Sequence, residues 1–174
     1  SNISYSGLVS GDDIGGSFSG AFDNKNIGSS KTVSISSSYS GVDSGNYTVT
    51  DQSSTTANIT ARTLTVSGLT ASNKTYDATT SATLDTSNIS YAGLVSGDSF
   101  SGSYTGTFNN ANVGTSKLVT ISSSYSGDDI NNYSITDQSS TGADITKASP
   151  TISGLSAQSK YSDESYTLAG TPSI

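Results

Sequence analysis

Lysine and acidic side chains are the main candidates for chemistry in this sequence, and Lys74, Tyr76 and Asp77 lie close together in it. A lysine can form an intramolecular isopeptide crosslink with an Asn or Asp side chain when a buried acid lies beside both. The simpler interpretation packs Tyr76 in the core and lets Asp77 cap a turn through the backbone. We favour it, because nothing in the sequence brings a crosslinking partner and a second acid to Lys74.

Acidic side chains in predicted loops are a second candidate. Asp98, Asp128 and Asp129 could supply oxygen ligands to Ca²⁺, which takes about six to eight of them. Asp12, Asp13 and Asp43 have the same character. Asp beside Gly also forms ordinary turns, and the sequence has no EF-hand or nonapeptide calcium pattern. We therefore predict turns and no cofactor, with a Ca²⁺ site as the alternative.

Catalytic machinery is difficult to build from this composition. The chain has no His, Cys, Met or Trp, which excludes a Ser-His-Asp triad, a Cys nucleophile, a disulfide framework and a zinc-thiolate site. Asp163 and Glu164 could in principle serve as the acid and base of a glycosidase, but Glu164 is the only Glu. We expect that this protein is not an enzyme.

The charge balance limits the partners that the chain can have. Its net charge is −7, whereas a nucleic-acid partner requires clustered Lys and Arg for phosphate binding. No apolar run reaches the length of a membrane span, and we expect no signal peptide. We expect neither nucleic-acid binding nor direct membrane insertion.

The elements that position these side chains are predicted to be strands. Apolar β-branched and aromatic residues alternate with Ser and Thr at 64–66, 119–121 and 133–135, and this period of two is typical of half-buried strands. Ser and Thr together make up 64 residues, and no stretch has a convincing helical period. The sequence therefore predicts an ordered all-β protein with almost no helix.

A long internal repeat is the strongest signal in the sequence. Residues 1–74 align without a gap with residues 87–160, and about 46 of the 74 pairs are identical. Phe22 pairs with Phe108, for example, and Lys31 with Lys117. The offset of 86 residues is too long for a solenoid rung or a propeller blade and suits a sandwich of about seven strands. We predict tandem Ig-like β-sandwich modules with an 86-residue repeat.

The repeat divides the chain into three modules. Residues 1–61 are predicted to be the C-terminal part of one module, 62–147 a complete module, and 148–174 the start of a third, in which residues 151–155 repeat residues 65–69. The strands expected in the complete module lie near 63–69, 82–84, 88–95, 103–108, 117–123, 132–137 and 142–147.

Residues 69–80 resemble the signature of the YDG domain, Asn-Lys-x-Tyr-Asp-Gly-Thr-Thr. Here Asn73, Lys74, Tyr76, Asp77, Thr79 and Thr80 match it, and Ala78 stands where Gly is usual. The family's V-x-G-D, N-V-G and N-Y landmarks recur at residues 95–98, 112–114 and 132–133. Residues 160–163 of the third module are similar to the related MBG (YGX-type) domain, although Ser162 replaces its Gly.

YDG domains occur in tandem in very large bacterial surface proteins, including filamentous-haemagglutinin-like adhesins. The resemblance implies an extracellular Ig-like module on the bacterial cell surface with no catalytic role, in which the motif residues are structural. We expect a secreted or surface-exposed stalk or fibre for adhesion or for a biofilm matrix. The alternative is an adhesin module that itself binds a glycan or a host protein, in a Ca²⁺-dependent manner.

Neighbouring modules of the same chain or filament are the expected partners. Pro150 favours an extended connection between the second and third modules. The chain starts inside one module and ends inside another, so the tail of one copy could complete the head of the next by strand donation, giving a head-to-tail filament. The simpler interpretation, which we favour, is that the sequence is a section of a longer continuous chain.

Overall fold

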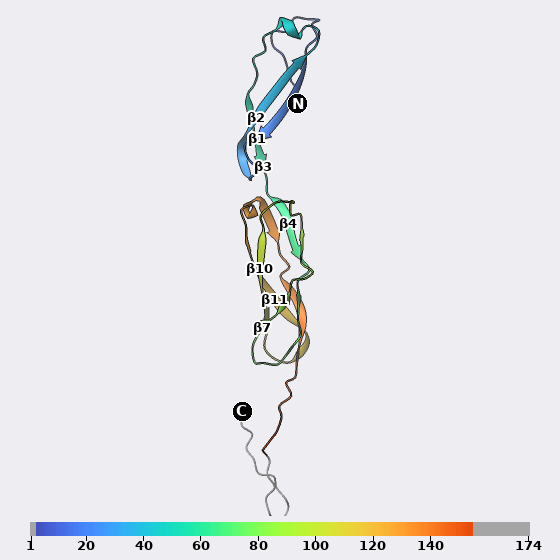
Figure 1. Ribbon diagram of the computed structural model, residues 1–174, viewed down its shortest axis with the longest axis vertical. Helices are drawn as coiled ribbons and strands as arrows, with labels where there is room; N and C mark the ends of the chain where they lie inside the picture. Colours follow the sequence, from blue (N-terminus) through green and yellow to red (C-terminus); the bar gives the residue numbers. More distant parts are fainter. Residues whose placement is uncertain (1–2, 155–174) are drawn as a thin grey trace, which may run out of the picture. The chain divides into compact units, whose positions relative to one another are not determined.

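A computed structural model describes residues 3–154 of the chain (Figure 1). Strands account for 50% of the described residues and helix for 4%. The predicted all-β class is therefore confirmed. The finer arrangement as Ig-like sandwiches with a tandem repeat stays a prediction.

Strands of unequal length make up the fold, with two one-turn 3-10 helices between them. The two longest strands have 13 residues each and begin at Gly28 and Gly114. The strands are β1 (Gly15–Phe22), β2 (Gly28–Ser40), β3 (Ser54–Ile59), β4 (Arg62–Ser67), β5 (Thr70–Ala71), β6 (Lys74–Thr75), β7 (Ser81–Ala82), β8 (Leu84–Asp85), β9 (Ser90–Ala92), β10 (Ser101–Phe108), β11 (Gly114–Ser126), β12 (Tyr133–Thr136) and β13 (Ser140–Thr146). The 3-10 helices are η1 (Ser44–Asn46) and η2 (Ile130–Asn132).

The strands predicted between residues 63 and 147 each overlap an observed strand. They correspond to β4, β7, β9, β10, β11, β12 and β13. The two-residue strands β5 and β6 were not predicted, because two residues are too few to display an alternating pattern. In β11 the alternation is visible directly, since Val119 and Ile121 are buried and the Thr120 between them is exposed.

The contacts of the chain define two compact units, which are described separately. The first unit comprises Ser1–Ser67, Ile89–Ser103 and Ser123–Asp137, and the second comprises Gly68–Asn88, Tyr104–Ser122 and Gln138–Ile174. β10 and β11 contribute residues to both units. None of the helical segments in residues 3–154 has the length and apolar character that would span a bilayer.

Two three-stranded sheets organise the first unit. In one, β2 lies between β1 and β3, and both pairs are antiparallel. In the other, β4 lies between β12, to which it is parallel, and β9, to which it is antiparallel. The central position of β4 buries Leu64 and Val66 completely or nearly so.

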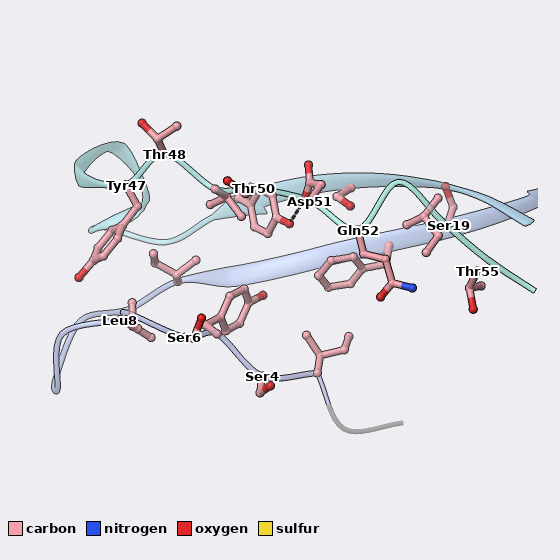
Figure 2. A pocket seen from close by; sticks show the side chains of 18 of the residues that line it. Ser4, Ser6, Leu8, Ser19, Tyr47, Thr48, Thr50, Asp51, Gln52 and Thr55 are labelled. Carbon is pink, nitrogen blue, oxygen red and sulfur yellow. Dashed lines mark hydrogen bonds between the residues drawn. The ribbon is translucent and has the colours of Figure 1, made fainter.

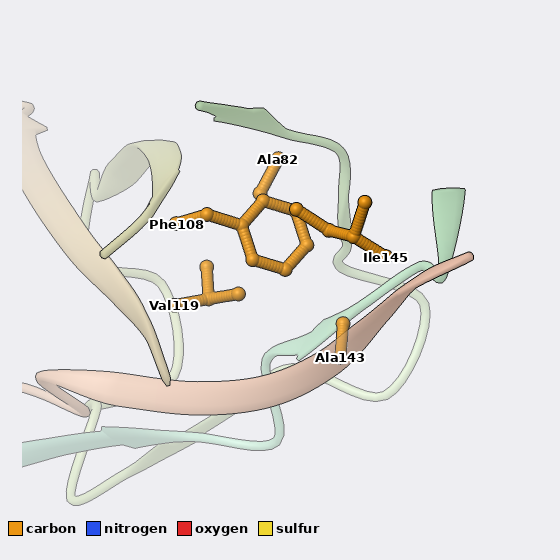
Figure 3. Packing of buried hydrophobic residues seen from close by; sticks show 5 residues of the cluster. All are labelled: Ala82, Phe108, Val119, Ala143 and Ile145. Atoms are coloured by element: carbon orange, nitrogen blue, oxygen red, sulfur yellow. The ribbon is translucent and has the colours of Figure 1, made fainter. Parts of the chain in front are cut away.

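The principal apolar core lies in the second unit. The side chains of Ala82, Phe108, Val119, Ala143 and Ile145 pack around the Phe108 ring (Figure 3). Ala71 and Leu84, from the short strands β5 and β8, cover this cluster. The short strands are therefore the elements that close the core.

Candidate functional site

The first unit contains an open groove of about 780 Å³ (Figure 2). Strands β1 and β2 supply Phe18, Val33, Ile35 and Tyr39, and two irregular segments, residues 3–8 and 47–52, supply most of the rest of the lining. Its lining combines aromatic and aliphatic side chains with polar ones. It is therefore the first candidate for a binding function.

Aromatic contacts order one side of the groove. Tyr39 packs edge-on against Phe18, with ring centroids 6.1 Å apart, and against Tyr5 at 6.4 Å. The Tyr39 hydroxyl donates a hydrogen bond to the carboxylate of Asp51, drawn as the dashed line in Figure 2. This bond raises the pKa of Tyr39, because a carboxylate acceptor favours the protonated phenol.

Hydrogen bonds connect residues 9–13 to Asp43 and Tyr47. The Tyr47 hydroxyl donates to Oδ2 of Asp12 at 2.6 Å and accepts the Val9 N–H at 3.0 Å. Asp43 accepts the Asp13 N–H at 2.8 Å. The Asp12 carboxylate raises the pKa of Tyr47. Residues 9–13 are therefore joined to Asp43 and to Tyr47, which lines the groove.

Burial differs sharply between the groove region and its sequence counterpart 86 residues later. Phe22 is 40% exposed, whereas the identical Phe108 is 2% exposed. Val33 and Ile35 are half-buried, whereas Val119 and Ile121 are buried. The side chains are the same, so the difference comes from their surroundings, since Ala71, Ala82 and Leu84 pack around Phe108.

Lys25 is the centre of a second site in the first unit. Its Nζ atom lies 2.7 Å from Oδ1 of Asp98 and 2.6 Å from Oδ1 of Asp129. The carboxylate side chains are only 10% and 11% exposed, whereas Lys25 is 60% exposed. Hydrogen bonding to Lys25 lowers the pKa of both aspartates, and the two carboxylates raise the pKa of Lys25. We call these three residues the lysine clamp.

Further hydrogen bonds surround the lysine clamp. The Ile27 N–H donates to Oδ1 of Asn132 at 3.0 Å, and Nδ2 of Asn132 donates to Oδ1 of Asn26 at 3.2 Å. On the acidic side, Tyr133 donates its hydroxyl proton to Asp98 at 2.5 Å. These contacts tie the turn between β1 and β2 to the loops that carry the two aspartates.

The predicted calcium residues are only partly brought together. Asp98 and Asp129 meet, but their shared counter-charge is the Lys25 ammonium, and Asp128 is exposed beyond them. No group of three or more His, Cys, Asp or Glu side chains gathers around a possible metal position within residues 3–154. The pair therefore acts in this structure as an acceptor for a cationic side chain.

Lys74, the lysine of the family motif, is surrounded by oxygen atoms. Nζ of Lys74 donates to Oδ1 of Asp77 and the carbonyl of Thr79 at 2.8 Å, and to Oγ1 of Thr79 and the carbonyl of Ser81 at 3.0 Å. It also lies 5.4 Å from the centre of the Phe108 ring. Lys74 thus ties the 77–81 loop over the core, which is a structural role.

Asp77 organises the turn, as the sequence predicted. Its Oδ1 accepts the N–H and the hydroxyl of Thr79, both at 2.9 Å. The hydrogen bond from Lys74, with those from Thr79, lowers the pKa of Asp77 to about 2. Ala78, between these residues, has a φ of 62°, a left-handed conformation in which Gly is favoured.

The remaining motif residues fasten the same region to neighbouring strands. Oδ1 of Asn73 accepts the Asp144 N–H at 2.7 Å, and the Thr80 carbonyl accepts the Phe108 N–H at 2.8 Å. The prediction that Tyr76 packs in the core is wrong, because its side chain is 44% exposed. Tyr76 contributes through its backbone instead, since its N–H donates to the carbonyl of Thr146.

Lys25 was not predicted as a site residue, although the internal repeat indicates it. Its counterpart in the repeat is Ala111, while the flanking Asn24 and Asn26 have Asn110 and Asn112 as counterparts. Both copies of the repeat keep the two Asn residues of this turn, but only one copy has a charged residue between them. That charge therefore indicates a contact that only this copy makes. Asp163, Glu164 and the MBG-like residues 160–163 lie outside the described residues.

Comparison with known families agrees with the motif residues. The chain matches the YDG domain over residues 1–57 and 60–142, which is well over half of its length. No curated protein and no solved structure matches it. The match includes the lysine clamp and the ordered turn at Lys74, Asp77 and Thr79. The chain therefore belongs to the YDG domain family.

Proposed function

We propose that this chain is a non-catalytic structural section of a large bacterial extracellular or cell-surface protein, in which it forms part of a stalk or fibre for adhesion or for a biofilm matrix. The observation that carries the proposal is the lysine clamp. Lys25 lies in the first stretch that matches the family, residues 1–57, and both of its aspartates lie in the second, residues 60–142. A tie between successive stretches is what a load-bearing protein needs.

The chain connection at this point favours the same role. Only residues 60 and 61 separate β3 from β4, so the connector has little length over which to bend. The hydrogen bond from Ile27 to Asn132 adds a second tie beside the ion pairs. Because the two carboxylates are mostly shielded from water, salt screens them less than a fully exposed pair.

The proposed architecture is a tandem array of Ig-like modules with an 86-residue period. The equal lengths of β1 and β10, and of β2 and β11, support it. In this arrangement the partners are neighbouring modules of the same chain or filament. The Ser- and Thr-rich surface and the net charge of −7 favour a soluble array.

Force spectroscopy on the whole chain, tethered through tags at its two ends, tests the structural role. We expect Lys25→Ala to lower the force at which the first extension occurs. Lys147→Ala is the matched control, because Lys147 is exposed and has no ion pair within residues 3–154. Equal forces for the wild-type chain and Lys25→Ala would contradict the proposal.

The second candidate function is ligand binding in the groove. It is favoured by one observation, the aromatic wall of Tyr5, Phe18 and Tyr39, since such rings stack on sugars and apolar groups. Binding of the whole chain to a glycan array, abolished by Tyr39→Ala, would support this candidate. Absence of binding, together with a force effect of Lys25→Ala, would favour the structural role.

A further inference from the structure

We propose that Lys25 and Asp98 form an intramolecular isopeptide bond. In this reaction Asp129 moves the protons, and the Tyr133 hydroxyl stabilises the charge that develops on the carboxyl group of Asp98. The inference deepens the structural role proposed above and rests on it for its use in the protein, because a covalent bond would replace an ionic tie between the two stretches that match the family. The chemistry depends only on the contacts of these four residues.

The lysine clamp already brings the reacting groups into contact. Nζ of Lys25, the nucleophile, lies 2.7 Å from Oδ1 of Asp98. The second carboxylate, that of Asp129, lies 2.6 Å from the same Nζ atom, within the reach of a general base. The two carboxylate side chains are only 10% and 11% exposed. A nucleophile, an electrophile and a proton carrier therefore meet at one shielded place.

Asp129 is fixed in the position of a proton carrier. Within residues 3–154 it is the only charged residue that is buried, at 8% exposed. Its Oδ2 accepts the Ser99 N–H at 2.8 Å, and its Oδ1 contacts Lys25. The oxygen that must remove protons from the ammonium is therefore held beside them.

Tyr133 is fixed in the position of an oxyanion donor. Its side chain is buried, and its hydroxyl oxygen accepts the Val95 N–H at 3.0 Å. The hydroxyl proton is donated to Oδ2 of Asp98 at 2.5 Å. When the amine attacks, negative charge develops on this oxygen, where a donor already in place stabilises it. Asp98, and not Asp129, is therefore the carboxyl group prepared for attack.

The reaction moves two protons and releases one water molecule. Asp129 takes a proton from the Lys25 ammonium and passes it to Oδ1 of Asp98, which leaves a neutral amine beside a neutral carboxyl group. The amine attacks Cγ of Asp98 and forms the N–C bond, while the C=O electron pair moves onto Oδ2. Asp129 then carries a second proton from the nitrogen to Oδ1. The Cγ–Oδ1 bond breaks, water leaves, the C=O bond re-forms at Oδ2, and the carboxylate of Asp129 is regenerated.

The surroundings favour the neutral product. A small cavity of about 200 Å³ lies beside Lys25 and Asp98, and Ile27, Ile59 and Val95 also line it. An apolar neighbourhood disfavours an ion pair relative to an uncharged amide. Groups held in contact also react as if one of them were present at about 10⁵–10⁸ M, which opposes hydrolysis of the bond by water.

The ion pair is the state that precedes the reaction. The two carboxylates raise the pKa of Lys25, so the neutral amine is rare at neutral pH and the bond accumulates slowly. A freshly purified chain therefore holds the lysine clamp as ion pairs, and an aged chain holds the amide.

Lys74, at which the sequence suggested this chemistry, does not meet the same requirements. Its Nζ atom lies 2.8 Å from Asp77, whose side chain is 52% exposed. The ion pairs of residues 3–154 give Lys74 no second acid. We therefore expect the crosslink at Lys25 and not at Lys74.

Intact-mass spectrometry of the whole chain during prolonged incubation at neutral pH is the first test. We expect the wild-type chain to lose the mass of one water molecule. Lys25→Arg should keep its full mass, because Arg retains the positive charge but stays protonated and is no nucleophile. Lys147→Arg is the matched control and should react like the wild-type chain, since Lys147 is exposed and lies outside the clamp. An unchanged mass of the wild-type chain, or the same loss in Lys25→Arg, would overturn the proposal.

Tryptic digestion of the aged chain locates the bond. Trypsin cleaves after unmodified Lys and Arg, so it should leave Lys25 uncut and release residues 1–31 joined to residues 75–117, which contain Asp98. A link from residues 1–31 to residues 118–147, which contain Asp129, would overturn the assignment of Asp98. Loss of water within residues 75–117 alone would indicate a succinimide and would overturn the crosslink.

Substitutions of the two assisting residues test their roles. Asp129→Ala leaves both reacting groups in place and should abolish the mass loss. Tyr133→Phe should slow it about 100-fold or more, as removal of one oxyanion donor does. Tyr47→Phe is the matched control and should react at the wild-type rate, because Tyr47 donates the equivalent bond to Asp12, which lies outside the clamp. Circular dichroism checks that each variant folds, and wild-type rates in folded Asp129→Ala and Tyr133→Phe would contradict the mechanism.

The outcomes separate this inference from the proposed function. A chain that keeps its full mass but loses resistance to force in Lys25→Ala overturns the isopeptide bond alone. A chain that loses water as described, but whose first extension needs the same force as that of Lys25→Ala, overturns the load-bearing role of the lysine clamp alone.

Discussion

The Nζ atom of Lys25 lies 2.6 Å from Oδ1 of Asp129, a residue from a distant part of the sequence whose side chain is 11% exposed. The same ammonium lies 2.7 Å from Asp98. Two mostly shielded carboxylates so close together would repel each other without a cation between them. Lys25 therefore determines the ionisation of this part of the molecule, which can be measured directly.

Removal of the Lys25 ammonium should change the titration of both aspartates. In Lys25→Ala we expect the pKa of Asp98 and that of Asp129 to rise from their lowered values, because their hydrogen bond to the cation is lost. Side-chain carboxyl shifts measured by NMR against pH would report this. Lys147→Ala should leave both pKa values unchanged, and unchanged values in Lys25→Ala would mean that the ion pairs do not form in solution.

The lysine clamp should stabilise the protein over a wide range of pH. Since the pKa values of Asp98 and Asp129 are lower in the folded state than the usual value of about 3.9, the stabilisation is present above that value. It is lost as the pH falls through the folded pKa values. The pKa of Lys25 is raised, so at high pH the loss begins only beyond the ordinary lysine range of about 10.4.

Urea unfolding at a series of pH values checks this dependence. The free energy of unfolding should be lower in Asp129→Asn than in the wild-type chain at pH 7, and the difference should shrink towards pH 2. Asp128→Asn is the control, because Asp128 is exposed. If the difference in unfolding free energy grew as the pH falls, it would contradict a stabilisation that depends on ionised Asp98 and Asp129.

The two equivalent phenylalanines should contribute very unequally to stability. Phe108→Ala removes a ring that is 2% exposed, at a cost of about 3–5 kcal/mol. Phe22 is 40% exposed, and for Phe22→Ala we expect a cost of about 1 kcal/mol, since less apolar area leaves contact. Chemical unfolding followed by circular dichroism gives both values. Equal costs would mean that the Phe22 ring is covered in solution.

Replacing Ala78 with Gly should stabilise the protein, because the backbone conformation at this position favours Gly. At a φ of 62° the Cβ atom is crowded, so Ala78→Gly should raise the free energy of unfolding by about 0.5–1 kcal/mol. Ala82→Gly, in a strand and buried, should instead lower it by about 1 kcal/mol. Thermal or urea unfolding of the two variants tests the contrast, and a loss of stability in Ala78→Gly would contradict it.

Strands and turns could be predicted from the sequence, because they depend on residues that are neighbours along the chain. Alternation of apolar and polar residues at 119–121 and 133–135 placed β11 and β12, since side chains of a strand point to opposite faces in turn. The turn at Asp77 was predicted for the same reason, because its carboxylate reaches the N–H of Thr79 two residues away. The family landmarks were likewise visible as contiguous residues.

Burial and long-range pairing were decided only in three dimensions. Phe22 and Phe108 are the same residue in the same local pattern, and no sequence rule distinguishes them, yet only Phe108 is covered by Ala82 and Ile145. The clamp of Lys25 on Asp98 and Asp129 likewise depends on chain segments that meet after folding. The sequence by itself determined which residues form strands and turns, because those choices follow from neighbours along the chain. The tertiary structure decided which of the two phenylalanines is buried and which carboxylates contact Lys25, because both depend on chain segments that are distant in the sequence.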